Sequence, residues 1–250
     1  MVKPVIVFAH GAWHQPLHYL SLLRSIQAKG HTVVSPVNAT LDLKGSSAGK
    51  TCQDDTKVIR DAMRPFLESG EDIVLVCHSY GGIPGTDAVE GNTVQERAAK
   101  GLKGGVKSVV HIASSALPQR GMCIFDMVGG GPEPWWDSDG TFGFPNQDGF
   151  DKLYSDVDSV TKAACTSALV RQSIESFRTP NMYSAPEVKA PLFYVVCDED
   201  QLVPPAGQKA LAEACKAKTI HLSLSHSPFL TDAGVRQLME FIDEAASVTS

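Results

Sequence analysis

Short apolar runs recur along the chain, and segments with helical periodicity separate them. Most of these runs are continuous and rich in Val and Ile, which is typical of strands that helices cover on both faces. Their alternation with helices predicts an α/β fold around a mostly parallel sheet of about six strands. The predicted strands are Val5–Ala9, Thr32–Ser35, Ile73–Cys77, Val106–Ile112, Leu192–Cys197 and Thr219–Leu222.

Four helices are predicted between and after these strands. In Pro16–Lys29, leucine and isoleucine recur at helical spacing. A second helix begins after Thr51, where Asp54 completes a capping-box pattern, and extends to about Ser69. Pro65 should kink this helix, because its ring removes a hydrogen bond and collides with the preceding turn. The other two helices are predicted at Ala206–Ala217 and Thr231–Ala246.

The stretch of residues 114–187 interrupts the alternation, because it contains no convincing apolar strand. A structureless loop of this length is unusual inside a compact domain, and the stretch holds two of the three tryptophans, Trp135 and Trp136. We therefore expect an inserted helical cap that is packed and not disordered. The predicted organisation is an α/β core formed by residues 1–113 and 188–250, with the cap at 114–187.

Composition and charge narrow the classes of partner. The chain carries 22 Lys and Arg against 28 Asp and Glu, and this net charge of −6 argues against nucleic acid or a membrane surface. No apolar run is long enough to span a membrane. The apolar stretch Val5–Ala9 is too short for a secretory signal, so we expect a cytoplasmic protein with a small-molecule substrate. The sequence leaves a homodimer open.

Neither disulfide nor metal chemistry is expected. The six cysteines include no C-x-x-C pair, which argues against a disulfide scaffold and a zinc ribbon. His10, His14 and His18 recur every four residues and could be mistaken for one metal-binding face. However, Pro16 lies between the last two, and no carboxylate motif accompanies them. We therefore predict no metal site.

The first chemical motif follows the third predicted strand. Cys77-His78-Ser79-Tyr80-Gly81 is a variant of Gly-x-Ser-x-Gly, the nucleophile elbow, in which a tight turn lifts the serine above the sheet edge. Small residues are needed two positions before and after the serine, because strand and helix approach closely there. Gly81 satisfies the second position, and Cys77 is small enough for the first. A serine that merely begins a helix is the alternative, and we predict Ser79 as a nucleophile.

A second motif, His10-Gly11-Ala12-Trp13-His14, follows the first predicted strand. Acyl transfer needs two backbone N–H donors for the oxyanion, one from the residue after the nucleophile and one from the loop after this early strand. These donors would be Tyr80 and Ala12. Gly11 would let the loop approach closely.

A histidine and three acids follow the last two predicted strands. His226 lies in the loop before the last helix, from which it can reach Ser79. After the preceding strand the chain reads Asp198-Glu199-Asp200, and a carboxylate there can orient the imidazole. The spacing alone does not choose among the three acids. The order serine, acid, histidine is the one that nucleophile-elbow enzymes use.

Together these residues resemble the α/β-hydrolase superfamily, and most closely its small esterases, lactonases and hydroxynitrile lyases with an HGAWH-type start. The likeness covers most of the chain, including Tyr194–Pro205, His226–Leu230 and Arg171-Gln172-Ser173, although the cap is otherwise poorly matched. It implies an α/β-hydrolase fold that needs no metal and no organic cofactor. By the family's spacing the acid is Asp200, with Asp198 as the second choice.

Within this family, residue type narrows the reaction. Dehalogenases and epoxide hydrolases carry an aspartate where this chain has Ser79. Hydroxynitrile lyases of the similar branch typically have threonine at the position of Gly11 and lysine at that of Ser227, so both departures favour hydrolysis. The resemblance implies a serine hydrolase in which Ser79 attacks, His226 transfers protons and Asp200 orients the imidazole.

The cap is expected to form the roof of an apolar pocket. The predicted substrate is therefore a small apolar or aromatic carboxylic ester or lactone. Two alternatives stay open: a non-hydrolytic C–C lyase or retro-Claisen enzyme with the same triad, and a ligand receptor that kept the fold. The side chains expected to line the pocket are Trp13, Tyr80, Trp135, Trp136 and Phe229.

Overall fold

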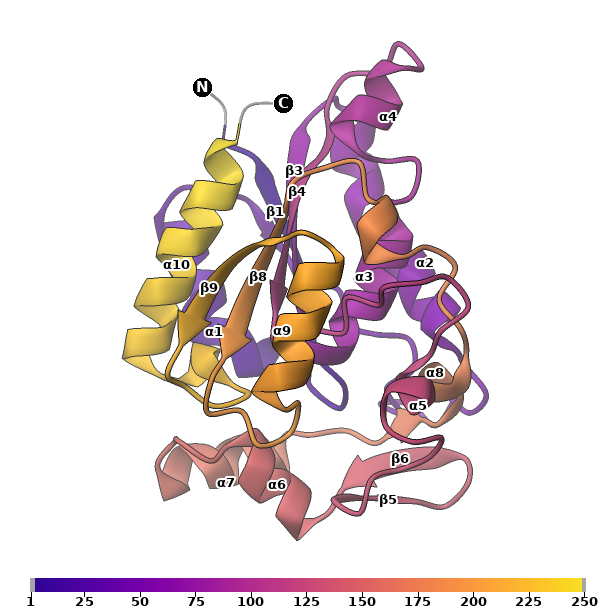
Figure 1. The fold of residues 1–250 in the computed structure, drawn as a ribbon, viewed down its shortest axis with the longest axis vertical. Helices are drawn as coiled ribbons and strands as arrows, with labels where there is room; N and C mark the ends of the chain where they lie inside the picture. The colour runs from indigo at the N-terminus through magenta and orange to yellow at the C-terminus, as the bar shows by residue number, and fades with distance from the viewer. Residues whose placement is uncertain (1–2, 249–250) are drawn as a thin grey trace.

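A six-stranded parallel sheet forms the centre of the computed structural model, which describes residues 3–248 (Figure 1). The strand order is β2-β1-β3-β4-β8-β9, and every neighbouring pair is parallel. The six predicted strands are confirmed. Residues 1–2 and 249–250 of the predicted core lie outside the described residues. The strands are β1 (Val5–Ala9), β2 (Val33–Val34), β3 (Asp72–His78), β4 (Gly105–Ile112), β8 (Leu192–Cys197) and β9 (Lys218–Leu222).

Helices cover both faces of this sheet, which explains why the central strands are apolar on both sides. All of β1 is buried. One apolar cluster joins the sheet to α1 and α10, and a second joins the opposite face to α2, α3 and α9. The helices of the core are α1 (Leu20–Ala28), α2 (Cys52–Glu68), α3 (Gly82–Val89), α4 (Val94–Ala98), α9 (Pro205–Ala214) and α10 (Asp232–Ser247).

The N-terminus of α2 has the capping box that the sequence predicts. Asp54 accepts a hydrogen bond from the Thr51 backbone N–H at 2.8 Å, and the Thr51 hydroxyl accepts one from the Gln53 N–H at 3.3 Å. Pro65 lies inside the helix, which nevertheless continues to Glu68. The proline therefore does not end the helix.

The 114–187 segment lies across the carboxyl ends of the sheet strands (Figure 1). Besides helices it contains a three-stranded antiparallel sheet, β5-β6-β7, which the sequence analysis missed. Its strands are two to four residues long, too short for a periodic pattern to show. The elements are α5 (Ile124–Met127), β5 (Trp136–Ser138), β6 (Phe142–Pro145), α6 (Gln147–Leu153), α7 (Ser159–Ser167), β7 (Gln172–Ser173) and α8 (Glu175–Arg178).

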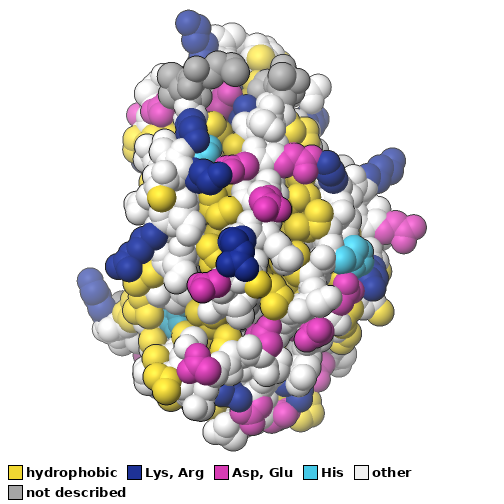
Figure 2. All heavy atoms as spheres, turned by 90° about the vertical axis from the view of Figure 1, so that its left-hand side faces the viewer, with side chains coloured by type: hydrophobic (Ala, Val, Ile, Leu, Met, Phe, Trp, Pro, Cys, Tyr) yellow, Lys and Arg dark blue, Asp and Glu magenta, His cyan; other side chains and the backbone are white. Residues whose placement is uncertain are grey.

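Basic and acidic side chains are interspersed on the surface. Figure 2 shows this pattern on one face of the molecule. Some of these side chains form exposed ion pairs, such as Lys29 with Asp243 at 3.2 Å. Among residues 3–248, no helix has the length and apolar character needed to cross a membrane.

Candidate active site

Ser79 occupies the tight turn between β3 and α3. Its φ of 52° lies in the left-handed region, which residues other than glycine rarely adopt. The turn also brings the helix close to β1, because a Cβ on Gly81 would lie only 2.4 Å from the carbonyl oxygen of Ala9. The structure therefore places Ser79 at the end of a strand, in the strained geometry of a nucleophile elbow.

Cys77 takes the place of the first glycine of that motif, and a glycine on the helix behind it makes room. The Cys77 side chain is fully buried, and a Cβ on Gly85 of α3 would lie 2.5 Å from its Sγ. Burial raises the pKa of the thiol and keeps it uncharged. The sequence analysis missed this partner, whose only signal is a glycine inside a helix.

His226 connects Ser79 to Asp200. The His226 Nε2 lies 3.0 Å from the Ser79 Oγ, and its Nδ1 lies 2.7 Å from the Asp200 Oδ2. The contact with the carboxylate places a proton on Nδ1, which leaves Nε2 free to accept the serine proton. Three residues that follow three different strands thus form one hydrogen-bonded chain.

Other donors hold the Asp200 carboxylate in place. Its Oδ1 accepts the backbone N–H groups of Leu202 at 2.8 Å and Val203 at 2.9 Å. Its Oδ2 accepts a hydrogen bond from the Gln208 Nε2 at 2.8 Å, beside the one from His226. The carboxylate is buried, so these donors supply the polar contacts that water would otherwise provide.

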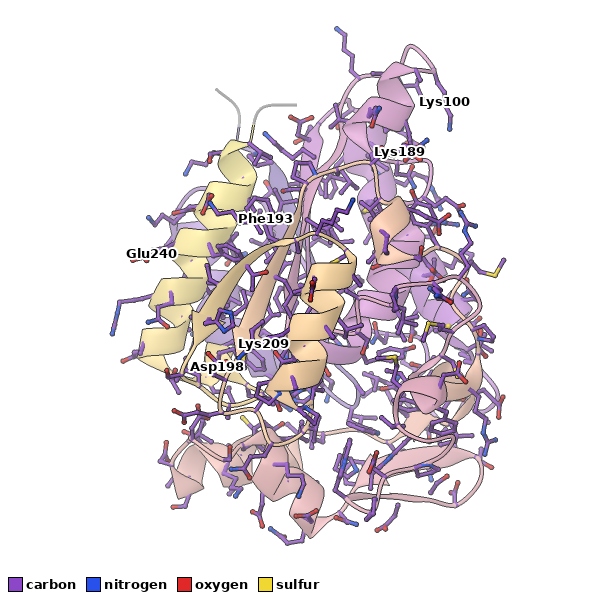
Figure 3. The ribbon with its side chains drawn as sticks, in the orientation of Figure 1. Lys100, Lys189, Phe193, Asp198, Lys209 and Glu240 are labelled. Carbon is purple, nitrogen blue, oxygen red and sulfur yellow. The ribbon has the colours of Figure 1, made fainter. Side chains whose placement is uncertain are left out.

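Asp198, the other candidate acid, lies near the surface and makes different contacts. Its carboxylate is 3.1 Å from the Lys209 Nζ and 3.0 Å from the His221 Nδ1. Figure 3 shows Asp198, directly after β8, beside Lys209 of α9. The ammonium of Lys209 lowers the pKa of the Asp198 carboxyl. The structure therefore brings Asp200, and not Asp198, to His226.

The backbone around His226 is fixed on both sides. The preceding residue, Ser225, donates its N–H to Asp156 of the 114–187 segment at 2.8 Å, and its hydroxyl also donates to that carboxylate. The carbonyl oxygen of His226 accepts a hydrogen bond from the His78 Nε2 at 2.9 Å. The sequence gives no signal for these two contacts, because Asp156 belongs to no motif and His78 occupies a variable position of the nucleophile motif.

The loop after β1 is held by hydrogen bonds to most of its backbone groups. The Gly11 N–H donates to the Tyr19 hydroxyl at 3.0 Å, and the Gly11 carbonyl accepts from the His10 Nδ1 at 3.0 Å. The Ala12 carbonyl accepts from the His14 Nδ1 at 2.7 Å. In the described part of the chain, no hydrogen bond uses the Ala12 N–H.

Trp13 is tied to the 114–187 segment by three hydrogen bonds. Its backbone N–H donates to the Gln172 Oε1 at 2.9 Å, and its carbonyl accepts from the Val170 N–H at 2.9 Å. Its indole Nε1 donates to the Gly143 carbonyl at 3.0 Å. The residue also has a positive φ of 61°, so these contacts hold an unfavourable backbone conformation.

The three histidines at four-residue spacing contact protein groups. His10 accepts the Asn38 N–H at 3.1 Å, His14 lies 2.9 Å from the Tyr154 hydroxyl, and His18 lies 3.1 Å from the Cys165 carbonyl. Burial lowers the pKa of His10 to about 4. Within residues 3–248, no group of three or more His, Cys, Asp or Glu side chains could hold a metal ion.

An apolar cavity of about 170 Å³ lies beside Ser79. Ala12 and Tyr80, whose backbone N–H groups the sequence predicts as oxyanion donors, both border this cavity. None of its lining residues is charged. The larger apolar side chains in its wall are Trp13, Ile124, Met127, Val128, Trp135, Phe177, Leu202, Val203 and Leu211.

Two of the aromatic residues expected in the pocket lie elsewhere. Trp136 packs behind the wall, with its ring centroid 5.3 Å from that of Trp13. The prediction that Phe229 lines the pocket is wrong, because this side chain is fully buried in the apolar cluster beneath the site. Its ring centroid lies 4.2 Å from that of Tyr19 and 4.9 Å from that of His78. The short turn Pro228–Leu230 directs its ring towards α1 and α10 and away from the cavity.

Comparison with known proteins agrees with this fold. The sequence model of the alpha/beta hydrolase family matches residues 6–238. The chain belongs to this family. It is 27% identical to the alpha/beta hydrolase nvfD of Aspergillus novofumigatus, in an alignment that covers 99% of this chain and 100% of nvfD. The family that the sequence resembles is therefore confirmed.

Solved structures of this hydrolase fold superpose on nearly the whole chain. Polyneuridine aldehyde esterase has a TM-score of 0.77 at 15% identity, over 97% of this chain and 99% of its own. A pyrethroid hydrolase from Sphingobium faniae has a TM-score of 0.72 at 16% identity, over 98% of both chains. At these identities the structural likeness shows the fold alone. The family match supports a hydrolase in general terms.

Proposed function

We propose that this hydrolase cleaves small apolar or aromatic carboxylic esters or lactones through an acyl-enzyme on Ser79. The observation that carries the proposal is the hydrogen-bonded chain of Ser79, His226 and Asp200 beside an apolar cavity. A serine is a weak nucleophile unless a neighbouring base accepts its proton. The 3.0 Å contact between the His226 Nε2 and the Ser79 Oγ supports that role for His226.

In the first half of the reaction, the Ser79 Oγ attacks the carbonyl carbon while its proton moves to the His226 Nε2. Asp200 stabilises the imidazolium that forms. The oxygen of the tetrahedral intermediate accepts hydrogen bonds from the N–H groups of Ala12 and Tyr80, which the fold holds in position before the reaction begins. The Ala12 N–H makes no hydrogen bond within residues 3–248 and is therefore available to the oxyanion, which supports this assignment.

In the second half, His226 donates its proton to the leaving alkoxide, and the acyl group stays on Ser79. A water molecule then attacks the acyl carbon while His226 accepts one of its protons. The carboxylic acid leaves, and His226 returns the proton to Ser79. For a lactone the alcohol and acid are two ends of one product.

The cavity supports the substrate class. An ionised substrate would lose its hydration there without gaining a partner, because no charged side chain lines the wall. The volume of about 170 Å³ suits a small acyl or alcohol group. The 114–187 segment, which supplies Trp135 and Phe177 to the wall, acts as the roof of the pocket.

The packing at Gly11 favours hydrolysis over cyanohydrin chemistry. A Cβ at this position would lie 2.8 Å from the His78 Nδ1 and 3.2 Å from the Ser79 Cβ. The threonine that similar lyases typically carry there would therefore displace His78, which also holds the His226 carbonyl.

The test uses p-nitrophenyl acetate and butyrate as substrates and a fluorophosphonate as a serine-directed inhibitor. We expect turnover of both esters, complete inhibition by the fluorophosphonate, and a loss of about 1,000-fold or more in kcat for Ser79→Ala and His226→Ala. His221→Ala is the matched control, because it removes an exposed histidine outside the site. A folded protein that hydrolyses neither ester and is not labelled would contradict the proposal and favour a receptor or a lyase.

A further inference from the structure

We infer that Gln172, a residue of the 114–187 segment that does not line the cavity, is a positioning residue for the oxyanion loop. The inference rests on the proposed function. Gln172 is fully buried in β7, and its side-chain amide reaches back to the loop after β1. There its Oε1 accepts the backbone N–H of Trp13, the residue directly after Ala12, at 2.9 Å.

The second end of the amide fixes which atom faces Trp13. The Ser176 hydroxyl donates its hydrogen to the Ser173 carbonyl at 2.7 Å, so its oxygen is left to accept. The Gln172 Nε2 lies 3.0 Å from that oxygen and donates to it. The carbonyl end must then point at Trp13, and the hydrogen bond pattern admits one orientation of the amide.

The hydrogen bond from the Trp13 N–H to Gln172 supports a strained part of the loop. Trp13 holds a φ of 61°, which it keeps only while the surrounding structure supports it. The peptide unit between Ala12 and Trp13 is gripped at both ends, by the His14 Nδ1 on its carbonyl at 2.7 Å and by Gln172 on its N–H. The Ala12 N–H belongs to the preceding peptide unit, whose Gly11 carbonyl accepts a hydrogen bond from the His10 Nδ1 at 3.0 Å. The two units meet at the Ala12 Cα, so a shift of the second unit also changes the direction of the Ala12 N–H.

Loss of the acceptor would leave a buried N–H without a partner, and the loop would shift to restore one. The Ala12 N–H would then no longer point at the position of the oxyanion. This displacement of the N–H weakens the binding of the transition state. It does not weaken the binding of the substrate, because the substrate's apolar contacts with the cavity stay in place. Gln172 therefore acts through Trp13 and does not touch the substrate.

The experiment compares Gln172→Leu with Asn181→Leu in the full-length chain. Asn181 is the matched control: it is also a buried amide of the 114–187 segment, and it also accepts a backbone N–H, that of Met122, at 2.9 Å. We expect Gln172→Leu to lower kcat for p-nitrophenyl butyrate about 10- to 100-fold with KM within about threefold, and Asn181→Leu to keep kcat. Affinity for a trifluoromethyl ketone, which forms a tetrahedral adduct, should fall by the same factor as kcat/KM.

Two further readouts keep the inference testable if a variant is unstable. Gln172→Glu keeps the acceptor oxygen and should keep kcat within about threefold. Hydrogen exchange of the Trp13 backbone amide, measured by NMR, should accelerate in Gln172→Leu and not in Asn181→Leu. Unchanged kcat in Gln172→Leu, or equal losses in both leucine variants, would overturn the positioning role while leaving the proposed function intact. An inactive, unlabelled wild-type protein would overturn both.

Discussion

Asp200 and Asp198 show how two identical side chains, two residues apart, come to have different roles. Asp200 is buried and contacts His226, whereas Asp198 pairs with Lys209 near the surface. The sequence left three acids open, because the direction of each side chain depends on the turn after β8. Only the resemblance to a family favoured Asp200, and the observed contacts agree with that choice.

This difference predicts opposite results for two matched substitutions. Asp200→Asn should lower kcat about 10,000-fold, because an amide cannot stabilise the imidazolium and can favour the wrong tautomer of His226. Asp198→Asn should keep kcat within about twofold, since its partly exposed carboxylate contacts Lys209 and His221 and not His226. Steady-state hydrolysis of p-nitrophenyl butyrate measures both. The reverse outcome would show that the assignment of the acid is wrong.

Residues that only position the reacting groups were the ones that sequence reasoning missed. Asp156 and Gln172 each reach a loop of the core through a single side chain. Asp156 belongs to no motif, and Gln172 lies in the Arg171-Gln172-Ser173 stretch of the family resemblance, which predicts no role for it. Such a contact depends on packing between segments far apart in the sequence. The prediction that Phe229 lines the pocket was wrong for the same reason, because its proximity to His226 in the sequence does not fix the direction of its ring.

At the scale of elements, the central sheet could be predicted and the sheet of the 114–187 segment could not. Strands buried on both faces must be continuously apolar, and this pattern is strong enough to give β1 and β8 their observed bounds. The strands β5 to β7 have only two to four residues each, so no period develops. The helix after Ser79 was expected only because the elbow motif requires one.

The contact between β3 and α3 yields a prediction about stability. Gly85→Ala should lower the free energy of unfolding by about 1–3 kcal/mol, because the added Cβ would lie 2.5 Å from the Cys77 Sγ. Adding Cys77→Gly to the Gly85→Ala variant should restore much of the lost stability, because it removes the sulfur. Urea denaturation followed by circular dichroism measures these changes.

The control for this pair is Gly207→Ala in α9, where an added Cβ meets no atom within 4 Å. That substitution should be neutral or stabilising by up to about 1 kcal/mol, as alanine is the better helix former. If Gly85→Ala were equally harmless, the close packing of Cys77 against α3 would not explain how the elbow accepts cysteine.

At the scale of the whole molecule, buried histidines link stability to pH. Burial lowers the pKa of His10 and His111 to about 4, against 6.5 for an unperturbed histidine, and it also lowers the pKa values of His14 and His78. The folded state then binds fewer protons than the unfolded state below pH 6.5. The free energy of unfolding must therefore fall as the pH drops from about 6.5 towards 4.

Two buried acids act in the opposite direction. Burial raises the pKa of Asp55 to about 6 and also raises that of Asp87, so these carboxyls stabilise the folded state more as the pH falls. They are fewer than the histidines and offset only part of the loss. Acid should therefore destabilise the protein through its histidines.

His111→Phe isolates one of these groups away from the site. His111 stacks on Tyr194 at a centroid distance of 6.0 Å, and its Nε2 has no hydrogen bond partner among the described residues. Its Nδ1 lies 3.3 Å from the Ser114 hydroxyl, which also donates to the Ser79 carbonyl at 3.0 Å, so phenylalanine leaves that hydroxyl paired. Between pH 7.5 and pH 5, the free energy of unfolding should fall by about 2 kcal/mol less in the variant than in the wild type. Urea unfolding at both pH values measures this, and an unchanged difference would show that His111 does not resist protonation.

The central claim is that Ser79 forms a covalent acyl intermediate, and a quenched reaction tests it most directly. The protein is mixed with p-nitrophenyl butyrate, stopped with acid during the first turnover, and mapped by peptide mass spectrometry. We predict a mass increase of one butyryl group on the peptide that contains Ser79, and none in Ser79→Ala. Hydrolysis with no adduct on Ser79, or with the butyryl group on another residue, would contradict the account.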